Sequence, residues 1–168
     1  SSGTRILAGN LKLGGDLTVS GSDLGGAQLT IGNSTSNRTL TILGNLIVNG
    51  TSASSLPNSQ VDLNSNGGFA IQVRLAGNLL VSGVGQITTL LGNSPGTVLF
   101  NGISQQYTNS SVYPNGYVNF SVGDGVASTT LLLNSKVDLI RSGSAPFSSS
   151  FTVAANSILN AGTNNITV

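Results

Sequence analysis

The chain contains no cysteine, histidine, methionine or tryptophan, and its five acidic residues are all aspartate. Without cysteine the fold cannot rely on disulfide bonds. Without histidine the abundant serine side chains have no base with which to form a Ser-His-Asp triad. No glycine-rich stretch ends in Lys-Ser or Lys-Thr, as a phosphate-binding loop requires. These absences exclude the commonest hydrolase and nucleotide-binding sites.

Charge is also scarce, at 7% of the residues, and the formal net charge is +1. Such a chain has no long-range field that would attract nucleic acid or an anionic membrane surface. The longest apolar runs are only a few residues, too short for a helix that crosses a bilayer. We therefore expect no nucleic-acid partner and no membrane insertion.

Serine, threonine, asparagine and glycine make up 83 of the 168 residues. A chain of this composition is a poor helix former. With 38% hydrophobic residues and a mean hydropathy of +0.23, it nevertheless lacks the low hydrophobicity and high charge of a disordered chain. The composition predicts an ordered, all-β protein with one core.

One motif recurs at intervals of 29 and 33 residues: glycine, Asn or Asp, leucine, any residue, valine, Ser or Asn, and glycine. It occurs at residues 15–21, 44–50 and 77–83. Between the copies, apolar residues alternate at period two over three to five positions, which is typical of short strands. Glycine and asparagine at the ends of each copy favour turns. The repeat thus predicts a series of turn, short strand and turn.

Strands this short suit a parallel β-solenoid (β-helix), in which each coil stacks on the last at about 4.8 Å. Coils of about 20 to 30 residues would give about five to eight coils in a single domain over residues 1–168. Like charges on successive coils would repel, which explains a surface of neutral hydroxyls and amides. A Greek-key sandwich remains the alternative for a small all-β domain.

Seven of the eight aromatic residues lie between Phe100 and Phe151, and residues 103–117 interrupt the rhythm of short strands. Asn115-Gly116 after a proline is a strong turn signal. We therefore expect an aromatic loop or hairpin that leaves the coil near 103–117. In one interpretation Tyr107, Tyr113 and Tyr117 offer flat faces to a glycan or a partner protein; in the other they cover the core.

The sequence predicts no catalytic residue, no cofactor and no metal site. A β-helix glycosidase would need two facing carboxyl groups about 5 to 10 Å apart. Asp62 and Asp138 each lie in a Val-Asp-Leu strand, where alternation would point them outward as solvated positions. Asp124 lies in a single Gly-Asp-Gly unit, whereas a calcium-binding repeat needs several in tandem, so we expect a tight turn there.

Residues 96–107 read GTVLFNGISQQY and resemble a segment common in very long, repetitive surface proteins of Bacteroidota. Residues 117–122 (YVNFSV) and 158–168 (ILNAGTNNITV) are similar to the continuation of that family, and the GNLxV repeats look like its earlier coils. The resemblance implies a right-handed β-helix in a giant adhesin, exported by the type IX secretion system and held at the cell surface, in some cases linked to gliding motility. It carries no catalytic residues over to this chain.

From these observations we expect a non-enzymatic stalk segment of a large extracellular or cell-surface bacterial protein. Its partners would be adjoining segments of the same polypeptide and the secretion or surface-anchoring machinery. The repeat pattern already runs at Leu11 and still runs at Ile166, so we also expect the chain to be an excerpt of a longer solenoid. The alternatives are a glycan-binding β-helix module, a polysaccharide-degrading β-helix enzyme and an ice-binding solenoid with outward threonine pairs on successive coils.

Overall fold

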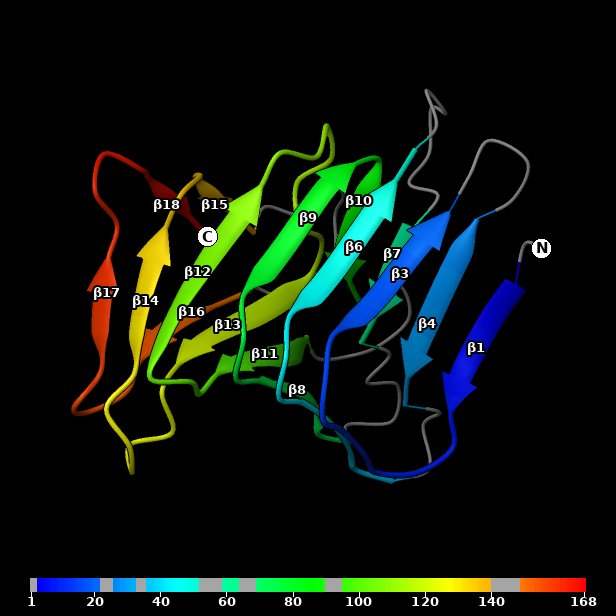
Figure 1. Cartoon of the computed structure of the whole chain (residues 1–168), viewed down its shortest axis with the longest axis horizontal. Helices are drawn as coiled ribbons and strands as arrows, with labels where there is room; N and C mark the ends of the chain where they lie inside the picture. The colour runs from blue at the N-terminus through cyan, green and yellow to red at the C-terminus, as the bar shows by residue number, and fades with distance from the viewer. Residues whose placement is uncertain are drawn as a thin grey trace.

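The protein folds as a parallel β-solenoid of about five turns, and the described residues include no helix (Figure 1). The structure is a computed structural model. It describes residues 3–21, 26–32, 36–51, 59–63, 69–89, 95–139 and 149–168.

Three sheets run along the solenoid, and the chain visits them in the same order in each of the first four coils. Sheet A contains β1 (Gly3–Leu7), β4 (Ala27–Ile31), β7 (Ser59–Asp62) and β10 (Gly85–Thr88). Sheet B contains β2 (Leu11–Leu13), β5 (Arg38–Ile42), β8 (Ile71–Leu75), β11 (Gly96–Phe100), β13 (Val118–Val122) and β16 (Phe151–Val153). Sheet C contains β3 (Leu17–Gly21), β6 (Leu46–Gly50), β9 (Leu79–Gly83), β12 (Ser104–Asn109), β14 (Thr130–Leu133) and β17 (Ile158–Asn160). The short strands β15 (Val137–Asp138) and β18 (Ile166–Thr167) form a separate pair.

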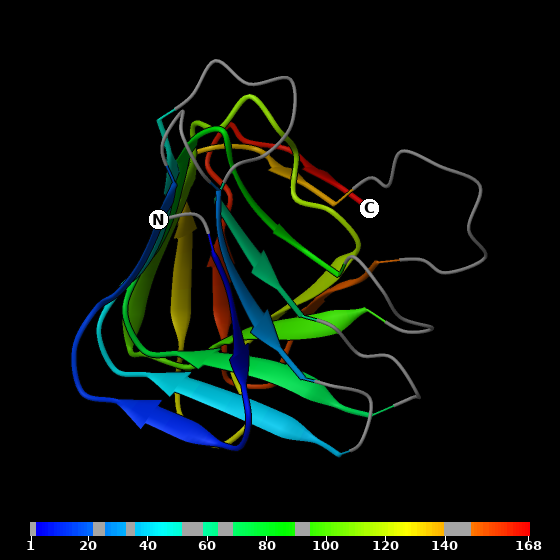
Figure 2. The ribbon, with the colours of Figure 1, turned by 90° about the vertical axis from the view of Figure 1, so that its right-hand side faces the viewer.

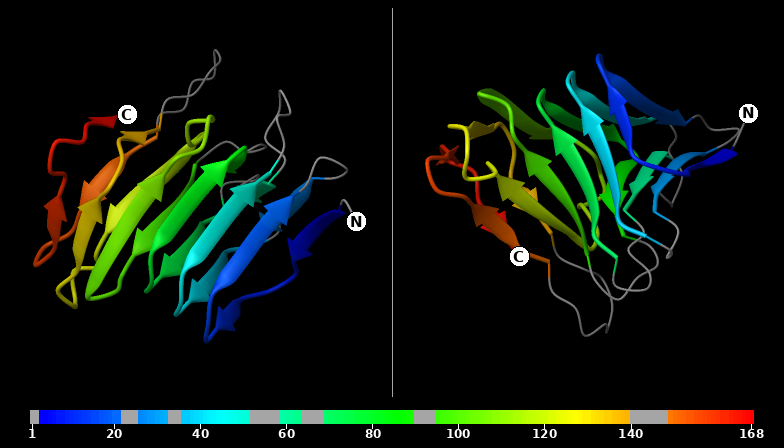
Figure 3. Two further views of the ribbon diagram at one scale, coloured as in Figure 1. Left: turned by 45° about the horizontal axis from the view of Figure 1, so that its top comes forward. Right: turned by 90° about the horizontal axis from the view of Figure 1, so that it is seen from below.

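All the strand pairs between described residues are parallel, which excludes the Greek-key sandwich. Viewed along the stack, the sheets enclose a roughly triangular core (Figure 2). Strands of one sheet lie side by side from one end of the molecule to the other, with β1 and β17 at opposite ends (Figure 3). The expected all-β solenoid is confirmed.

Apolar side chains stack in register inside this core. In sheet C, Leu46 lies between Leu17 and Leu79 in the neighbouring coils, and both Leu46 and Leu79 are fully buried. Burial of one such side chain contributes about 1.5–3 kcal/mol. In the first coil, which has a neighbour on one side only, an inward leucine is not covered. Leu11 is 43% exposed, whereas its register partner Leu40 in the second coil is 1% exposed. Each coil therefore completes the core of its neighbour.

The recurring Gly-Asn pair forms the corner between sheets B and C. A Cβ atom on Gly77 would overlap the carbonyl group of Gly44 in the preceding coil, so only glycine fits. The Asn45 side chain accepts a hydrogen bond from the Asn78 backbone N–H at 2.9 Å. In the same way Asp16 accepts from the Asn45 N–H at 2.7 Å. The motif thus stacks corner on corner, with glycine allowing close approach and the Asn or Asp oxygen satisfying a backbone donor.

The C-terminal half of the core is aromatic. The Phe120 ring makes edge contacts with Phe100 and Tyr107, each at a centroid distance of 5.6 Å, and with Phe151 at 6.3 Å. Such contacts add about 0.5–1.5 kcal/mol each to the burial of the rings. The aromatic enrichment noticed in the sequence is therefore mainly a core feature.

The expected aromatic hairpin near 103–117 is wrong for the first half of that region. Residues 104–109 form β12, which pairs in parallel with β9 and β14 and remains within sheet C. Gln105 is 1% exposed, and its amide nitrogen donates to the carbonyl oxygens of Leu75 (2.8 Å) and Gly77. Its amide oxygen accepts from the Gly102 N–H at 2.7 Å. Phe100 pairs with Leu75 and Tyr107 with Leu79, so this corner contains three more residues than the one in the preceding coil. The buried, hydrogen-bonded Gln105 fills it, and the strands on both sides remain in register.

Candidate functional site

The three tyrosines do not form a shared surface, which corrects the interpretation that all three offer flat faces to a ligand. Tyr107 is 0% exposed and Tyr117 is 5% exposed, so both belong to the core. The reason is register: Tyr107 takes the inward position that Leu79 and Leu133 occupy in the neighbouring coils. Only Tyr113 is half-buried and reaches the surface.

Tyr107 anchors the segment that carries Tyr113. Its phenolic oxygen accepts a hydrogen bond from the Asn115 side-chain nitrogen at 2.7 Å, and Asn115 is fully buried. Burial raises the pKa of the Tyr107 phenol to about 12, because the phenolate would lose its hydration. The pair fixes the corner at residues 110–117, which has no strand and follows β12 where each of the first four coils places a strand of sheet A.

A surface hollow of about 220 Å³ lies beside Tyr113 and is the first candidate site. It combines an aromatic ring, an ion pair and neutral polar groups from β12, the corner segment and β15. Its lining residues are Asn109, Ser111, Val112, Tyr113, Pro114, Lys136 and Asp138.

Hydrogen bonds hold the wall of this hollow. The Ser111 hydroxyl donates to the Gly85 carbonyl oxygen at 2.6 Å and accepts from the Tyr113 N–H at 3.1 Å. The Asn109 side-chain oxygen accepts from the Ser111 N–H at 2.9 Å. These contacts tie the corner to the preceding coil and fix the backbone that presents Tyr113.

The charged side of the hollow comes from β15 and the residue before it. Lys136 Nζ lies 3.3 Å from Asp138 Oδ2, and their side chains are 71% and 20% exposed. Sequence reasoning noticed Asp138 but missed Lys136. The signal was present in the sequence, because residues two apart on an extended strand share a face. What it could not show was that this strand stacks beside Tyr113.

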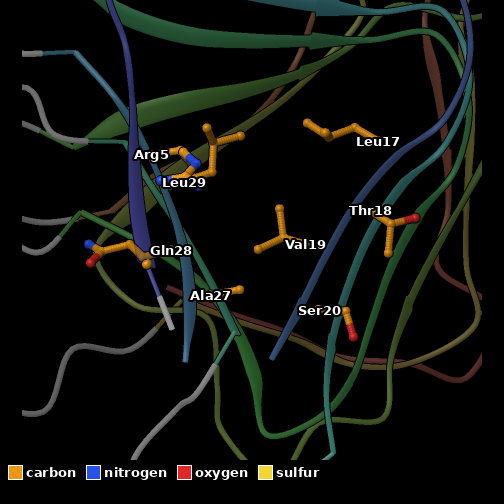
Figure 4. A pocket seen from close by; sticks show the side chains of 9 residues that line it. Arg5, Leu17, Thr18, Val19, Ser20, Ala27, Gln28 and Leu29 are labelled. Carbon is orange, nitrogen blue, oxygen red and sulfur yellow. The ribbon is translucent and has the colours of Figure 1, made fainter. Parts of the chain in front are cut away.

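A second hollow, of about 250 Å³, lies inside the first coil (Figure 4). Leu17, Val19 and Leu29 point into it, while Thr18 and Ser20 point away. Arg5 pairs in register with Leu29, at a position that Val61 and Ile87 continue in the following coils. This hollow is the open end of the apolar core, with an arginine where later coils place an aliphatic residue.

Asp62 and Asp138 do not form a catalytic pair. Asp62 is 3% exposed rather than solvated as expected, and its carboxylate accepts from the Gln28 side chain at 3.4 Å. Asp138 stands about three coils further along, about 14 Å at the usual strand spacing. This separation exceeds the 5 to 10 Å that a two-carboxylate glycosidase uses.

Asp124 lies in a turn between two glycines of positive φ. A hydrogen bond from the Val126 backbone N–H and the nearby Arg74 guanidinium, at 2.9 Å, lower the pKa of its carboxyl. The described residues contain no group of three potential metal-ligating side chains. The described part of the chain contains no helix, and therefore no helix that could cross a membrane.

An ice-binding face would need exposed threonines, but the adjacent Thr88 and Thr89 are only 5% and 7% exposed. They cannot present a flat hydroxyl array to ice. Thr39 and Thr41 in β5 are partly exposed, but their register partners are Gln72 and Arg74 on one side. Neither pair therefore forms the exposed ladder of threonines on successive coils that ice binding requires.

Comparison of the chain with protein-family models, curated proteins and solved structures gave no match.

Proposed function

We propose that this chain is a structural stalk segment of a large adhesin on a bacterial surface. The observation that carries the proposal is the continuous stacking of sheets B and C, each with six strands paired in parallel and in register. At about 4.8 Å per strand, six stacked strands give a rod about 24 Å long. A rod of this kind holds whatever adjoins it at a fixed distance.

Side-chain ladders on the outside of the coils support the same role. On sheet A the Gln28 side chain lies between Thr4 and Asp62, and Gln60 donates to Gln86 at 3.3 Å. Gln86 in turn donates to the Pro114 carbonyl oxygen at 3.0 Å. Because these contacts join successive coils, they resist bending and shear between them.

The resemblance to repetitive Bacteroidota surface proteins supports export by the type IX system and a place outside the cell. In this proposal the partners are adjoining segments of the same polypeptide and the machinery that secretes or anchors it. In this role the chain contributes length and stiffness to adhesion or gliding.

A segment exchange in the organism that carries the gene tests this role. The 168 residues would be replaced by an unrelated β-solenoid of equal rise, and in a second strain by a flexible Gly/Ser linker with the same number of residues. Surface display would be measured with an antibody to a neighbouring segment, and attachment with an adhesion assay.

A stalk predicts that the solenoid exchange keeps adhesion, whereas the flexible linker lowers it although surface display is unchanged. Loss of adhesion in both strains at equal display would contradict a purely structural role. An antibody to this segment that labels only the cell interior would contradict the surface location.

A further inference from the structure

The hollow beside Tyr113 has the chemistry of a carbohydrate subsite, and we propose that it binds a single ring of a neutral glycan. This inference does not rest on the stalk role, since a rod can carry a lateral binding site or lack one. It concerns the corner at residues 110–117 and the strand β15 that stacks next to it.

The site is built before any ligand arrives. Ser111, which lines the hollow, is held by its contacts with Gly85 and with the Tyr113 N–H, and the same corner segment is anchored by the buried hydrogen bond between Tyr107 and Asn115. A ligand would therefore meet a preorganised backbone, which lowers the entropic cost of binding.

One side of the hollow is apolar. Tyr113 is half-buried, and its neighbours Val112 (74% exposed) and Pro114 are exposed. A pyranose ring has a face of C–H groups that packs on such a surface. Without a ligand the aliphatic side chain of Val112 is exposed to water, and a bound sugar ring would cover it.

The lining of the hollow also includes a polar pair of opposite charge. Asp138 accepts through a carboxylate that has about four acceptor sites, and Lys136 Nζ has three donors. Neighbouring hydroxyl groups of a sugar both donate and accept, so one diol can bond to the carboxylate and the ammonium together. Hydrogen bonds to charged groups are the stronger ones.

Size and charge define the ligand class. A hollow of about 220 Å³ is smaller than the 300–1,000 Å³ of pockets for drug-sized ligands, so it fits one ring and not a long chain. Lys136 and Asp138 lie 3.3 Å apart and balance each other's charge, so the site has no net charge with which to select an acidic sugar. A neutral hexose at the end or side of a glycan is the ligand that matches.

The first experiment is a glycan array probed with the 168-residue protein, followed by titration calorimetry with the neutral glycans that bind. We expect Tyr113→Ala and Asp138→Asn each to weaken binding at least tenfold, and Tyr113→Phe, which keeps the ring, to weaken it less than threefold. The matched control is Asp124→Asn, which removes a carboxylate that is paired with Arg74 and does not line the hollow, and it should leave affinity unchanged.

Amide chemical-shift mapping on the unchanged protein makes the test independent of whether the variants fold. The shifts should concentrate at residues 109–114 and 136–138. No binding to any neutral glycan, shifts elsewhere, or affinity that survives both Tyr113→Ala and Asp138→Asn would overturn the proposal. Selective binding of acidic glycans that weakens with added salt would overturn the neutral class.

Discussion

Replacement of Gly77 by alanine should destabilise the solenoid, although Gly77 lies in a surface turn between β8 and β9. Its backbone φ is not in the left-handed region, so the cost does not arise from an unfavourable conformation. It arises because the new Cβ would overlap the Gly44 carbonyl carbon and oxygen and lie 2.8 Å from the Asn45 nitrogen. All three atoms belong to the backbone of the preceding coil and cannot rotate away.

The size of the destabilisation depends on how far the backbone of the two corners must move apart. Relief of the overlap requires the two corners to separate by roughly an ångström, which lengthens the 3.1 Å hydrogen bond from the Gly77 N–H to the Gly44 oxygen. Overpacking of this kind costs about 1–3 kcal/mol. For a chain of this length that corresponds to a melting temperature lower by about 2–12 °C.

The motif supplies its own control. Gly15 occupies the same place in the first coil, but a Cβ there would meet no atom within 4 Å. Gly15→Ala should therefore leave stability unchanged or raise it by about 0.4–1 kcal/mol, because alanine restricts the unfolded chain. Urea unfolding followed by circular dichroism would compare the two variants with the parent protein. If Gly77→Ala and Gly15→Ala unfold at the same urea concentration, the close stacking of the corners is wrong.

Three further predictions concern single side chains. Because the pKa of Tyr107 is raised to about 12, the folded protein holds this proton more tightly than the unfolded chain. The difference contributes about 2–3 kcal/mol to the free energy of unfolding. This contribution is present below pH 10 and should be lost as the pH rises from about 10 to 12. Tyr107→Phe should remove that part of the pH dependence, measured by urea unfolding at several pH values, and an unchanged alkaline slope would contradict the burial of the phenol. Phe120→Ala should cost about 3–5 kcal/mol in urea unfolding because it removes three ring contacts, and a loss under 1 kcal/mol would be inconsistent with this core. Asn45→Ala should cost about 0.5–1.5 kcal/mol by leaving the Asn78 N–H without its acceptor, and faster amide exchange at Asn78 would report the loss, whereas unaltered exchange would argue against the ladder.

The sequence was sufficient to predict the solenoid because period-two alternation and the Gly-Asn motif act locally. Leu46 and Val48 are inward in β6 as the alternation requires, and both are fully buried. The motif was interpreted as turn, strand and turn; its structural role in stacking depends on atoms of the neighbouring coil, which no single copy reveals.

The candidate site was harder to predict, since it depends on which coil lies next to which corner. Tyr107, Tyr113 and Tyr117 look equivalent in the sequence, yet the inward position of β12 buries the first and the corner exposes only the second. Alternation also misplaced Asp62, because it indicates which side of a strand a residue faces but not whether that side is covered. Thr30 and Thr88, its register partners in β4 and β10, are buried too, so three successive residues of that ladder are shielded.

The corner between sheets B and C has the same length in each of the first three coils, at residues 14–16, 43–45 and 76–78, and the strands on both sides of it stay in register. A stretch of gene running from one such corner to the next therefore encodes one interchangeable unit with matching joints at both ends. Tandem duplication or loss of that unit would lengthen or shorten the rod by one rise, about 4.8 Å, without a new kind of contact. The length of the rod could thus change by recombination in small, equal steps. The side chains at the other corners could meanwhile diverge independently.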